Sequence, residues 1–192
     1  PDDQLFSADV TQDVAFGPLN LGLSEDDVRY RVEEALQLMG IEHLSGRPTH
    51  QLSYGERKRV TIAGAVAMRP DVLLLDEPSA GLDPTGVEEL FSVLEGLAAR
   101  GTALALATHD VEFALAWADE AAVFTSGRVN QGPVSELLAD VELMREAHLR
   151  RPWLLELAEA LKLTNKPRSL SEVLEVLCTL DKPRGVLEER PG

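Results

Sequence analysis

The strongest constraint on the fold is a short run of apolar residues that ends in two carboxylates. Residues 72–75, Val-Leu-Leu-Leu, are followed directly by Asp76, Glu77 and Pro78. The run is too short and too uniformly apolar for a strand with one face in water, so we expect a central strand of a parallel sheet. The two carboxylates then stand at the carboxyl end of that strand, where open α/β sheets bind ligands.

The rest of the chain alternates between helical and strand-like segments. Helix starts are indicated by capping residues and helix ends by Gly or Pro, while the strands are apolar runs. In chain order we expect a loop over 1–23, helices over 24–40 and 53–69, the strand over 72–75, a helix from 84, a strand over 102–108, a helix over 111–118, a strand over 121–125, and helices from 133 onward. This alternation predicts a parallel α/β architecture.

Composition and charge exclude several classes of protein. At 192 residues the chain has room for one core, with or without a small appendage. The net charge of −15 argues against a nucleic-acid binder, which needs clustered Lys and Arg, and against direct docking on anionic lipid. No apolar run approaches the ~18 residues of a membrane span.

The single cysteine and the first residues bear on the compartment and on processing. Cys178 has no partner for an internal disulfide, which fits a reducing compartment, and its helical apolar surroundings predict a core position. The chain starts at Pro1 without an initiating Met or a basic region, so we expect no signal peptide and a chain that begins in mid-domain.

The acidic pair at the strand end suits phosphate chemistry. Asp76 can hold Mg²⁺ through its water shell, and Glu77 can orient and polarise the water that attacks a γ-phosphate. His109 ends the next strand, so strand adjacency would bring it near Glu77. Asp83 can cap the helix that begins at Pro84. The alternative for the acidic pair is a strand terminus that caps the following turn.

The start of the second helix is a candidate anion site. Ser53 and Glu56 have capping-box spacing, and Gly55 leaves backbone N–H groups accessible beside the Ser53 hydroxyl. An ordinary helix cap explains the same residues. A loop that grips phosphates, of the form G-x-x-x-x-G-K-[ST], is missing, because none of the 14 glycines is followed by Lys and then Ser or Thr.

Together these segments resemble ABC-type ATPases. Residues 52–56, Leu-Ser-Tyr-Gly-Glu, resemble the L-S-G-G-Q signature, residues 72–77 the Walker B strand, residues 79–83 the D-loop, and residues 108–110 the switch-histidine segment. The likeness covers roughly residues 1–130. It implies an α/β fold that is part of a P-loop NTPase core, with a parallel sheet, an α-helical signature subdomain and a helical C-terminal tail.

Three further segments, residues 1–6, 13–18 and 62–70, are similar to energy-coupling-factor ATPases of the cobalt/nickel type. The resemblance implies uptake of cobalt or another transition-metal ion, with nickel and vitamins left open. It also implies a second ABC ATPase subunit in a head-to-tail homo- or heterodimer, a transmembrane coupling component and a substrate-binding membrane component, and no nucleic acid. The location would be the cytoplasmic face of the cell membrane, as a peripheral protein.

The resemblance also implies roles for individual residues, with ATP and Mg²⁺ as cofactors. Catalytic roles fall to Glu77 and His109. Nucleotide-binding roles fall to Ser53, Gly55, Glu56, Asp76 and Asp83, and Asp76 also holds Mg²⁺ through water. Ser53 and Gly55 would serve the partner's nucleotide, whereas Asp76, Glu77 and His109 would serve the nucleotide of their own subunit. We expect three parts: residues 1–69 with the signature, residues 70–130 with the Walker B strand, and the helical extension 131–192.

The chain departs from the family pattern in three ways. The phosphate-binding loop and the aromatic residue that stacks on adenine are absent, and the Q-loop glutamine would precede Pro1, so Gln4 does not match it. Tyr54 and Glu56 replace Gly and Gln of the signature. A carboxylate beside a triphosphate is repulsive unless Glu56 points away from it, as a capping box would require.

We therefore expect an N-terminally truncated ATPase that is inactive as an isolated chain. The alternative is a degenerate, non-catalytic half-subunit that supplies only its signature face to an intact partner. DNA-repair and chromosome-structuring ATPases share these motifs, but the heptad repeats are absent and the strong negative charge disfavours them.

Overall fold

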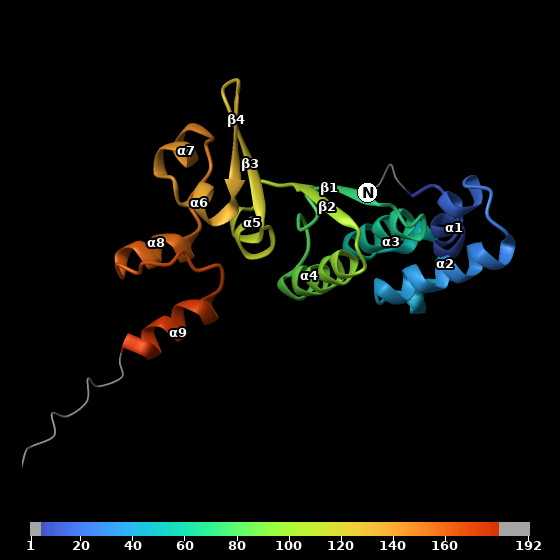
Figure 1. The fold of residues 1–192 in the computed structure, drawn as a ribbon. Coiled ribbons are helices and arrows are strands. Elements are labelled where there is room, and N and C mark those ends of the chain that lie inside the picture. The colour runs from blue at the N-terminus through green and yellow to red at the C-terminus, as the bar shows by residue number, and fades with distance from the viewer. Residues whose placement is uncertain (1–4, 181–192) are drawn as a thin grey trace, which may run out of the picture. The chain divides into compact units, whose positions relative to one another are not determined.

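The computed structural model describes residues 5–180, which form two compact units that meet in sequence at Thr108 and His109. In the first unit, three helices pack against one another: α1 (Val10–Asn20), α2 (Glu25–Leu38) and α3 (Tyr54–Ala67). The unit continues through strand β1 (Val72–Asp76), helix α4 (Pro84–Ala99) and strand β2 (Ala103–Ala107). Figure 1 shows this unit in blue to green, with α3 between α1 and the two strands.

Helix starts in this unit follow the capping residues in the sequence. Ser24 caps α2 by accepting a hydrogen bond from the Asp27 backbone, and the chain turns at Gly40 with a φ of 64°. Helix α4, expected from residue 84, buries an apolar stripe that includes Leu90 and Leu94. Two short 3₁₀ turns, Glu42–Leu44 and Thr49–Gln51, lie in the segment that we expected to be a loop.

Helix α1 corrects the expectation of a loop over residues 1–23. Asp9 caps the helix by accepting from the Gln12 backbone, and Val10, Val14 and Pro18, four residues apart, are all buried. Gly17 and Pro18 are helix breakers by local propensity, but burial of this stripe against the neighbouring helices outweighs that cost. Local sequence signals were therefore a poor guide here.

The glycine in α1 has a packing role. A Cβ atom at Gly17 would lie 2.6 Å from Cγ of Met68, and it would lie 3.6 Å from the backbone oxygen of Gly64 in α3. Gly17 therefore leaves room for the side chain of Met68, the residue that directly follows α3.

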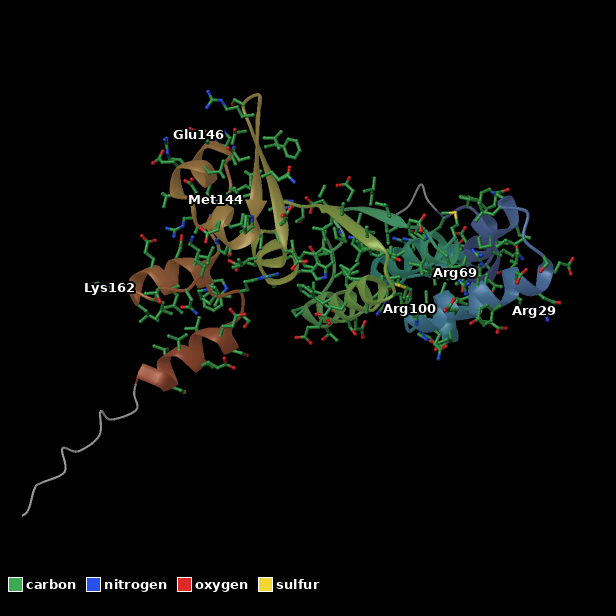
Figure 2. The ribbon with its side chains drawn as sticks, viewed as in Figure 1. Arg29, Arg69, Arg100, Met144, Glu146 and Lys162 are labelled. Carbon is green, nitrogen blue, oxygen red and sulfur yellow. The ribbon has the colours of Figure 1, made fainter. Side chains whose placement is uncertain are left out.

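The carboxylate of Glu34 connects α2 to the residues that follow α3 and α4. Glu34 of α2 accepts hydrogen bonds from Arg69, just after α3, at 2.6 Å and from Arg100, just after α4, at 3.0 Å. The two arginine side chains lie close together in Figure 2. The hydrogen bond from Arg69, with smaller contributions from both guanidinium charges, lowers the pKa of Glu34.

Strands β1 and β2 pair in parallel, as the sequence predicts, with Leu73 opposite Leu104 and Asp76 opposite Ala107. The expectation of a central strand buried on both faces is wrong for the described residues, where β1 pairs with β2 alone. Leu73 is buried, but Leu74 is 75% exposed. Side chains alternate between the two faces of a strand, and only one face of this pair is covered.

Over its described residues, 109–180, the second unit consists of a hairpin and five helices. The hairpin pairs β3 (Glu120–Thr125) with β4 (Arg128–Pro133), and the helices are α5 (Val111–Trp117), α6 (Val134–Ala139), α7 (Val141–Glu146), α8 (Trp153–Ala160) and α9 (Leu170–Leu180). Leu115, Val134, Met144, Leu155 and Val173 belong to its core. Within the described part of the chain, no helix is long and apolar enough to cross a membrane.

The pairing of β3 corrects a third expectation. Residues 121–125 do form a strand, but it pairs antiparallel with β4 and is no third strand of the parallel sheet. Gly127, with a φ of 80°, turns the chain back on itself and brings β4 alongside. Cys178 is exposed on α9, so its predicted core position is also wrong.

The contact between α1 and α3 makes a prediction about stability. We expect Gly17→Leu to lower the free energy of unfolding by about 1–3 kcal/mol, because the added side chain overpacks the α1–α3 contact. Urea unfolding followed by circular dichroism measures the loss. Gly46→Leu is the matched control, since a Cβ there meets open space. Equal stability of the two variants would contradict the packing role of Gly17.

Candidate functional site

Helix α3 begins with the capping box that the sequence predicts. The Ser53 hydroxyl accepts a hydrogen bond from the Glu56 backbone N–H at 3.3 Å, and the Ser53 backbone N–H donates to the Glu56 carboxylate at 2.7 Å. Arg47 donates to the other carboxylate oxygen of Glu56 at 3.2 Å. Glu56 is thus turned back onto its own helix, which removes the objection that its charge would repel an anion in front of Ser53.

This start of α3 keeps its capacity for anion binding. Ser53 uses its oxygen as an acceptor in the cap, so the hydroxyl proton remains available for a donor bond. Gly55 is partly exposed on the first turn, and the positive end of the helix dipole lies at the same place.

At the end of β1, the two carboxylates lie in different environments. Asp76 is exposed and stands opposite Ala107 of β2. Glu77 is half-buried: its backbone N–H donates to the Ala107 carbonyl at 2.8 Å, and its carboxylate accepts from the Thr108 hydroxyl at 3.1 Å. The Glu77 backbone has a φ of 46°, a left-handed conformation that costs a non-glycine residue about 1 kcal/mol or more.

The residues at this strand end fit a magnesium ion that is held mostly by other ligands. Carboxylate oxygens are the donors that Mg²⁺ prefers, and the exposed Asp76 offers one such group. Mg²⁺ keeps several waters and takes phosphate oxygens, so one protein carboxylate suffices. Among residues 5–180, no group of three or more His, Cys, Asp or Glu side chains is arranged to hold a metal by itself.

The turn after β1 packs against the start of α3. Asp83 caps α4 by accepting from the Gly86 backbone at 2.7 Å, as expected. The ring of Tyr54 lies over Gly81, where a Cβ would come within 2.6 Å of a ring carbon. Gly81 also has a φ of 73°, so both the Tyr54 ring and the backbone conformation favour glycine at this position. Ser53, Gly55 and Asp83 line one pocket of about 270 Å³.

Lys58 is the residue at this site that the sequence interpretation missed. It is buried, and its Nζ donates to the backbone oxygens of Glu77 and Ala80, at 2.7 Å each. Burial lowers the pKa of Lys58, and the nearby charge of Glu77 acts in the opposite direction. A signal was present: Lys58 lies four residues before the buried Ile62, so it falls on the inner face of α3.

His109 is exposed and is the first residue of the second unit, while Thr108, its neighbour in sequence, contacts Glu77 in the first unit. The proximity of His109 to Glu77 therefore stays a prediction, as do the catalytic and nucleotide-binding roles of the other residues. His43 and His50 are exposed.

The comparisons with known proteins decide the family. The model of the ABC transporter family matches residues 3–80. Residues 3–80 are therefore part of an ABC transporter ATPase domain. The chain is 56% identical over 158 residues to the cobalt import ATP-binding protein CbiO of Rhodobacter capsulatus, covering 82% of this chain and 56% of that protein. It is 46% identical over 162 residues to the energy-coupling factor transporter ATP-binding protein EcfA of Methanocaldococcus jannaschii, covering 84% and 58%.

A solved structure supports the same assignment of this ABC ATPase chain. CbiO1 from Clostridium perfringens, described as part of the ABC transporter complex cbiONQ, superposes with a TM-score of 0.67 at 48% identity. The match covers 83% of this chain and 64% of that protein. The expected family and the α/β fold with a parallel sheet are confirmed. The chain spans little more than half the length of these curated relatives.

The capping box predicts how stability depends on pH. The backbone hydrogen bond from Ser53 is the main reason that the pKa of Glu56 is lowered. Stability from ionised Glu56 is therefore present above the ordinary glutamate range and is lost as the pH falls through the lowered folded pKa. We expect Glu56→Gln to cost about 0.3–1 kcal/mol of unfolding free energy at neutral pH, and less in acid.

Urea unfolding at several pH values, from neutral to about pH 3, measures this difference. Glu33→Gln, which removes an exposed glutamate of α2, controls for the loss of one negative charge. A difference between wild type and Glu56→Gln that stays constant or grows in acid would contradict the charged capping box.

Proposed function

We propose that this chain is the signature and Walker B portion of the ATP-binding subunit of an energy-coupling-factor importer for cobalt or another transition-metal ion. The observation that carries the proposal is the contact between the helix that starts at Ser53 and the strand end at Asp76 and Glu77. Lys58 of this helix donates hydrogen bonds to the turn after the strand, and so holds a phosphate-binding helix start beside the acidic pair. The names of the relatives support the transport role and the metal.

The residues then divide between two nucleotides. Ser53 and Gly55 face the ATP of a neighbouring subunit, because the N-terminus of α3 offers a hydroxyl, backbone N–H groups and a positive dipole end. Asp76, Glu77 and His109 serve the ATP of their own subunit, and Asp83 lies at the interface. Bound Mg²⁺, held in part by Asp76, neutralises phosphate charge.

In this scheme Glu77 orients the attacking water. The Thr108 hydroxyl and two backbone contacts hold Glu77 in one conformation, so the carboxylate is positioned before ATP arrives. Preorganised groups of this kind supply most of the catalysis in phosphoryl transfer, which depends on positioning and electrostatics.

We also propose that the 192-residue chain by itself does not hydrolyse ATP. It contains no G-x-x-x-x-G-K-[ST] sequence, so the backbone cradle and the lysine that position the β- and γ-phosphates are not supplied by this chain. Without them Glu77 has no positioned phosphate on which to act.

The test joins the chain to the segment that precedes the matching region in the Rhodobacter relative. We expect the 192-residue chain to show no ATP turnover and the chimera to hydrolyse ATP. Glu77→Gln in the chimera should lower kcat by about 10²- to 10⁴-fold, because a positioned acid–base group is removed. Glu88→Gln, an exposed carboxylate of α4, is the control. Turnover by the 192-residue chain that Glu77→Gln abolishes would contradict the proposal.

A second candidate is a non-catalytic half-subunit that lends its signature to an intact partner. The completeness of the α3 cap within this chain favours it, since Ser53, Gly55 and Glu56 need no other segment to adopt their arrangement. The same preparation discriminates between the two. If the 192-residue chain stimulates an intact relative, and Ser53→Ala abolishes the effect whereas Glu77→Gln does not, the half-subunit function holds.

The partners and the location also belong to this proposal. We expect a second ATPase subunit, a transmembrane coupling component and a substrate-binding membrane component, with the chain on the cytoplasmic face of the membrane. Phe6 and Phe16 of α1, 63% and 48% exposed, form an edge-to-face pair with ring centroids 4.6 Å apart. Leu19 of α1 and its C-cap residue Leu21 are also exposed, and the CbiO1 neighbour is described as part of a transporter complex.

This surface makes a prediction about assembly. We expect Phe16→Ser to weaken co-purification of the chain with a co-expressed coupling component by tenfold or more, about the value of one buried aromatic anchor. The control is Tyr30→Ser, which removes another exposed aromatic residue from the same unit. Unchanged recovery of the Phe16→Ser complex would assign these phenylalanines to the chain's own packing.

A further inference from the structure

Lys58 connects the two ends of the candidate site. It lies on α3 little more than one turn after Ser53, on the side of the helix that faces the end of β1. Two of its three ammonium donors are used at 2.7 Å, one on the Glu77 carbonyl and one on the Ala80 carbonyl. The side chain is 9% exposed, so water competes little for these bonds.

The two carbonyls belong to a turn that needs support. Glu77 has the left-handed backbone conformation noted above, and the turn closes through weak or moderate hydrogen bonds, Ala80 N–H to the Glu77 carbonyl at 3.3 Å and Leu82 N–H to the Ser79 carbonyl at 3.1 Å. The turn then leads into the Asp83 cap of α4. The ammonium group of Lys58 donates hydrogen bonds to the carbonyls at both ends of the turn from Glu77 to Ala80.

A purely space-filling role does not explain a lysine at this position. An ammonium ion withdrawn from water carries a large desolvation cost, which an apolar side chain of similar length would avoid. A buried lysine is therefore accounted for by what its charge contacts. Here these contacts are the Glu77 and Ala80 carbonyls, with the Tyr54 ring centroid 5.6 Å away.

We propose that Lys58 is a positioning residue for Glu77, fixing the backbone of the catalytic turn to the helix that carries Ser53 and Gly55. The end of α3 that faces a neighbour's nucleotide and the carboxylate that faces the subunit's own then move as one body. A displacement at Ser53 is passed to the Glu77 backbone through the Lys58 side chain. The catalytic consequence rests on the proposed function, whereas the mechanical link does not.

Hydrogen exchange on the 192-residue chain tests the link directly. In Lys58→Met, which keeps the length of the side chain and removes the donors, we expect amides of the turn such as Ala80 and Leu82 to exchange about 10- to 100-fold faster. Hydrogen bonds to charged groups change an equilibrium by about one to two decades. Amides inside α2 should keep their wild-type rates.

Two further variants separate positioning from general destabilisation. Lys58→Arg retains a cation and donors, and it should restore part of the protection in the turn. Arg59→Met removes the next cation of α3, which pairs with the Glu89 carboxylate of α4 and makes no hydrogen bond to the turn among the described residues. It should leave exchange at Ala80 and Leu82 unchanged.

Three outcomes would overturn the proposal. The turn of Lys58→Met could keep wild-type exchange, exchange could rise equally in the turn and in α2, or Arg59→Met could have the same effect as Lys58→Met. Each would show that Lys58 does not act on the turn in particular.

The ATPase chimera supplies the catalytic readout. There, Lys58→Met should lower kcat by tenfold or more and leave KM for ATP within about twofold, because Glu77 is displaced while the phosphate-binding loop is untouched. A rise in KM with unchanged kcat would overturn the positioning role. A chimera without any ATPase activity would count against the proposed function, and the exchange experiment would still decide the link.

Discussion

Helix α3 is the element on which the first unit depends, because each part of it holds a different neighbour. Its N-terminus is closed by the Ser53–Glu56 box, its inner face carries Lys58 to the turn after β1, and Gly64 lies at the close approach of α1. Beyond its C-terminus, Arg69 reaches Glu34 of α2. Packing of this one amphipathic helix therefore sets where the polar residues of the site lie relative to one another.

The chemistry of the site follows from how two kinds of charge are handled. The carboxylate of Glu56 accepts hydrogen bonds from the Ser53 backbone and from Arg47, so it is turned away from an incoming anion. The ammonium group of Lys58 is buried and donates to backbone oxygens, so it does not contact the anion either. What remains exposed is the hydroxyl and amide surface around Ser53 and Gly55 on one side, and Asp76 on the other. This division suits one surface that receives phosphate and another that receives a hydrated cation.

Sequence patterns succeeded where a few adjacent residues decide the outcome. The capping box at Ser53, the Asp83 cap and the turn at Gly40 are local arrangements, and each formed as predicted. The patterns failed where distant residues decide. Gly17 and Pro18 indicated a loop, but burial of their helix against α3 prevailed. The β3–β4 pairing was missed because β4 carries little apolar character, and its partner strand determines its structure.

The sequence by itself determined the family, most of the elements and the chemical groups available for phosphate and Mg²⁺. These depend on residue type and spacing along the chain. Only the tertiary structure decided that Lys58 holds the Glu77 turn, that Thr108 holds the Glu77 carboxylate, and that Tyr54 covers Gly81. Each of these contacts joins residues nearly 20 or more positions apart, and its energy depends on distances of a few ångströms that packing alone sets. A lysine in a helix reads the same in sequence whether its ammonium is in water or on two buried carbonyls.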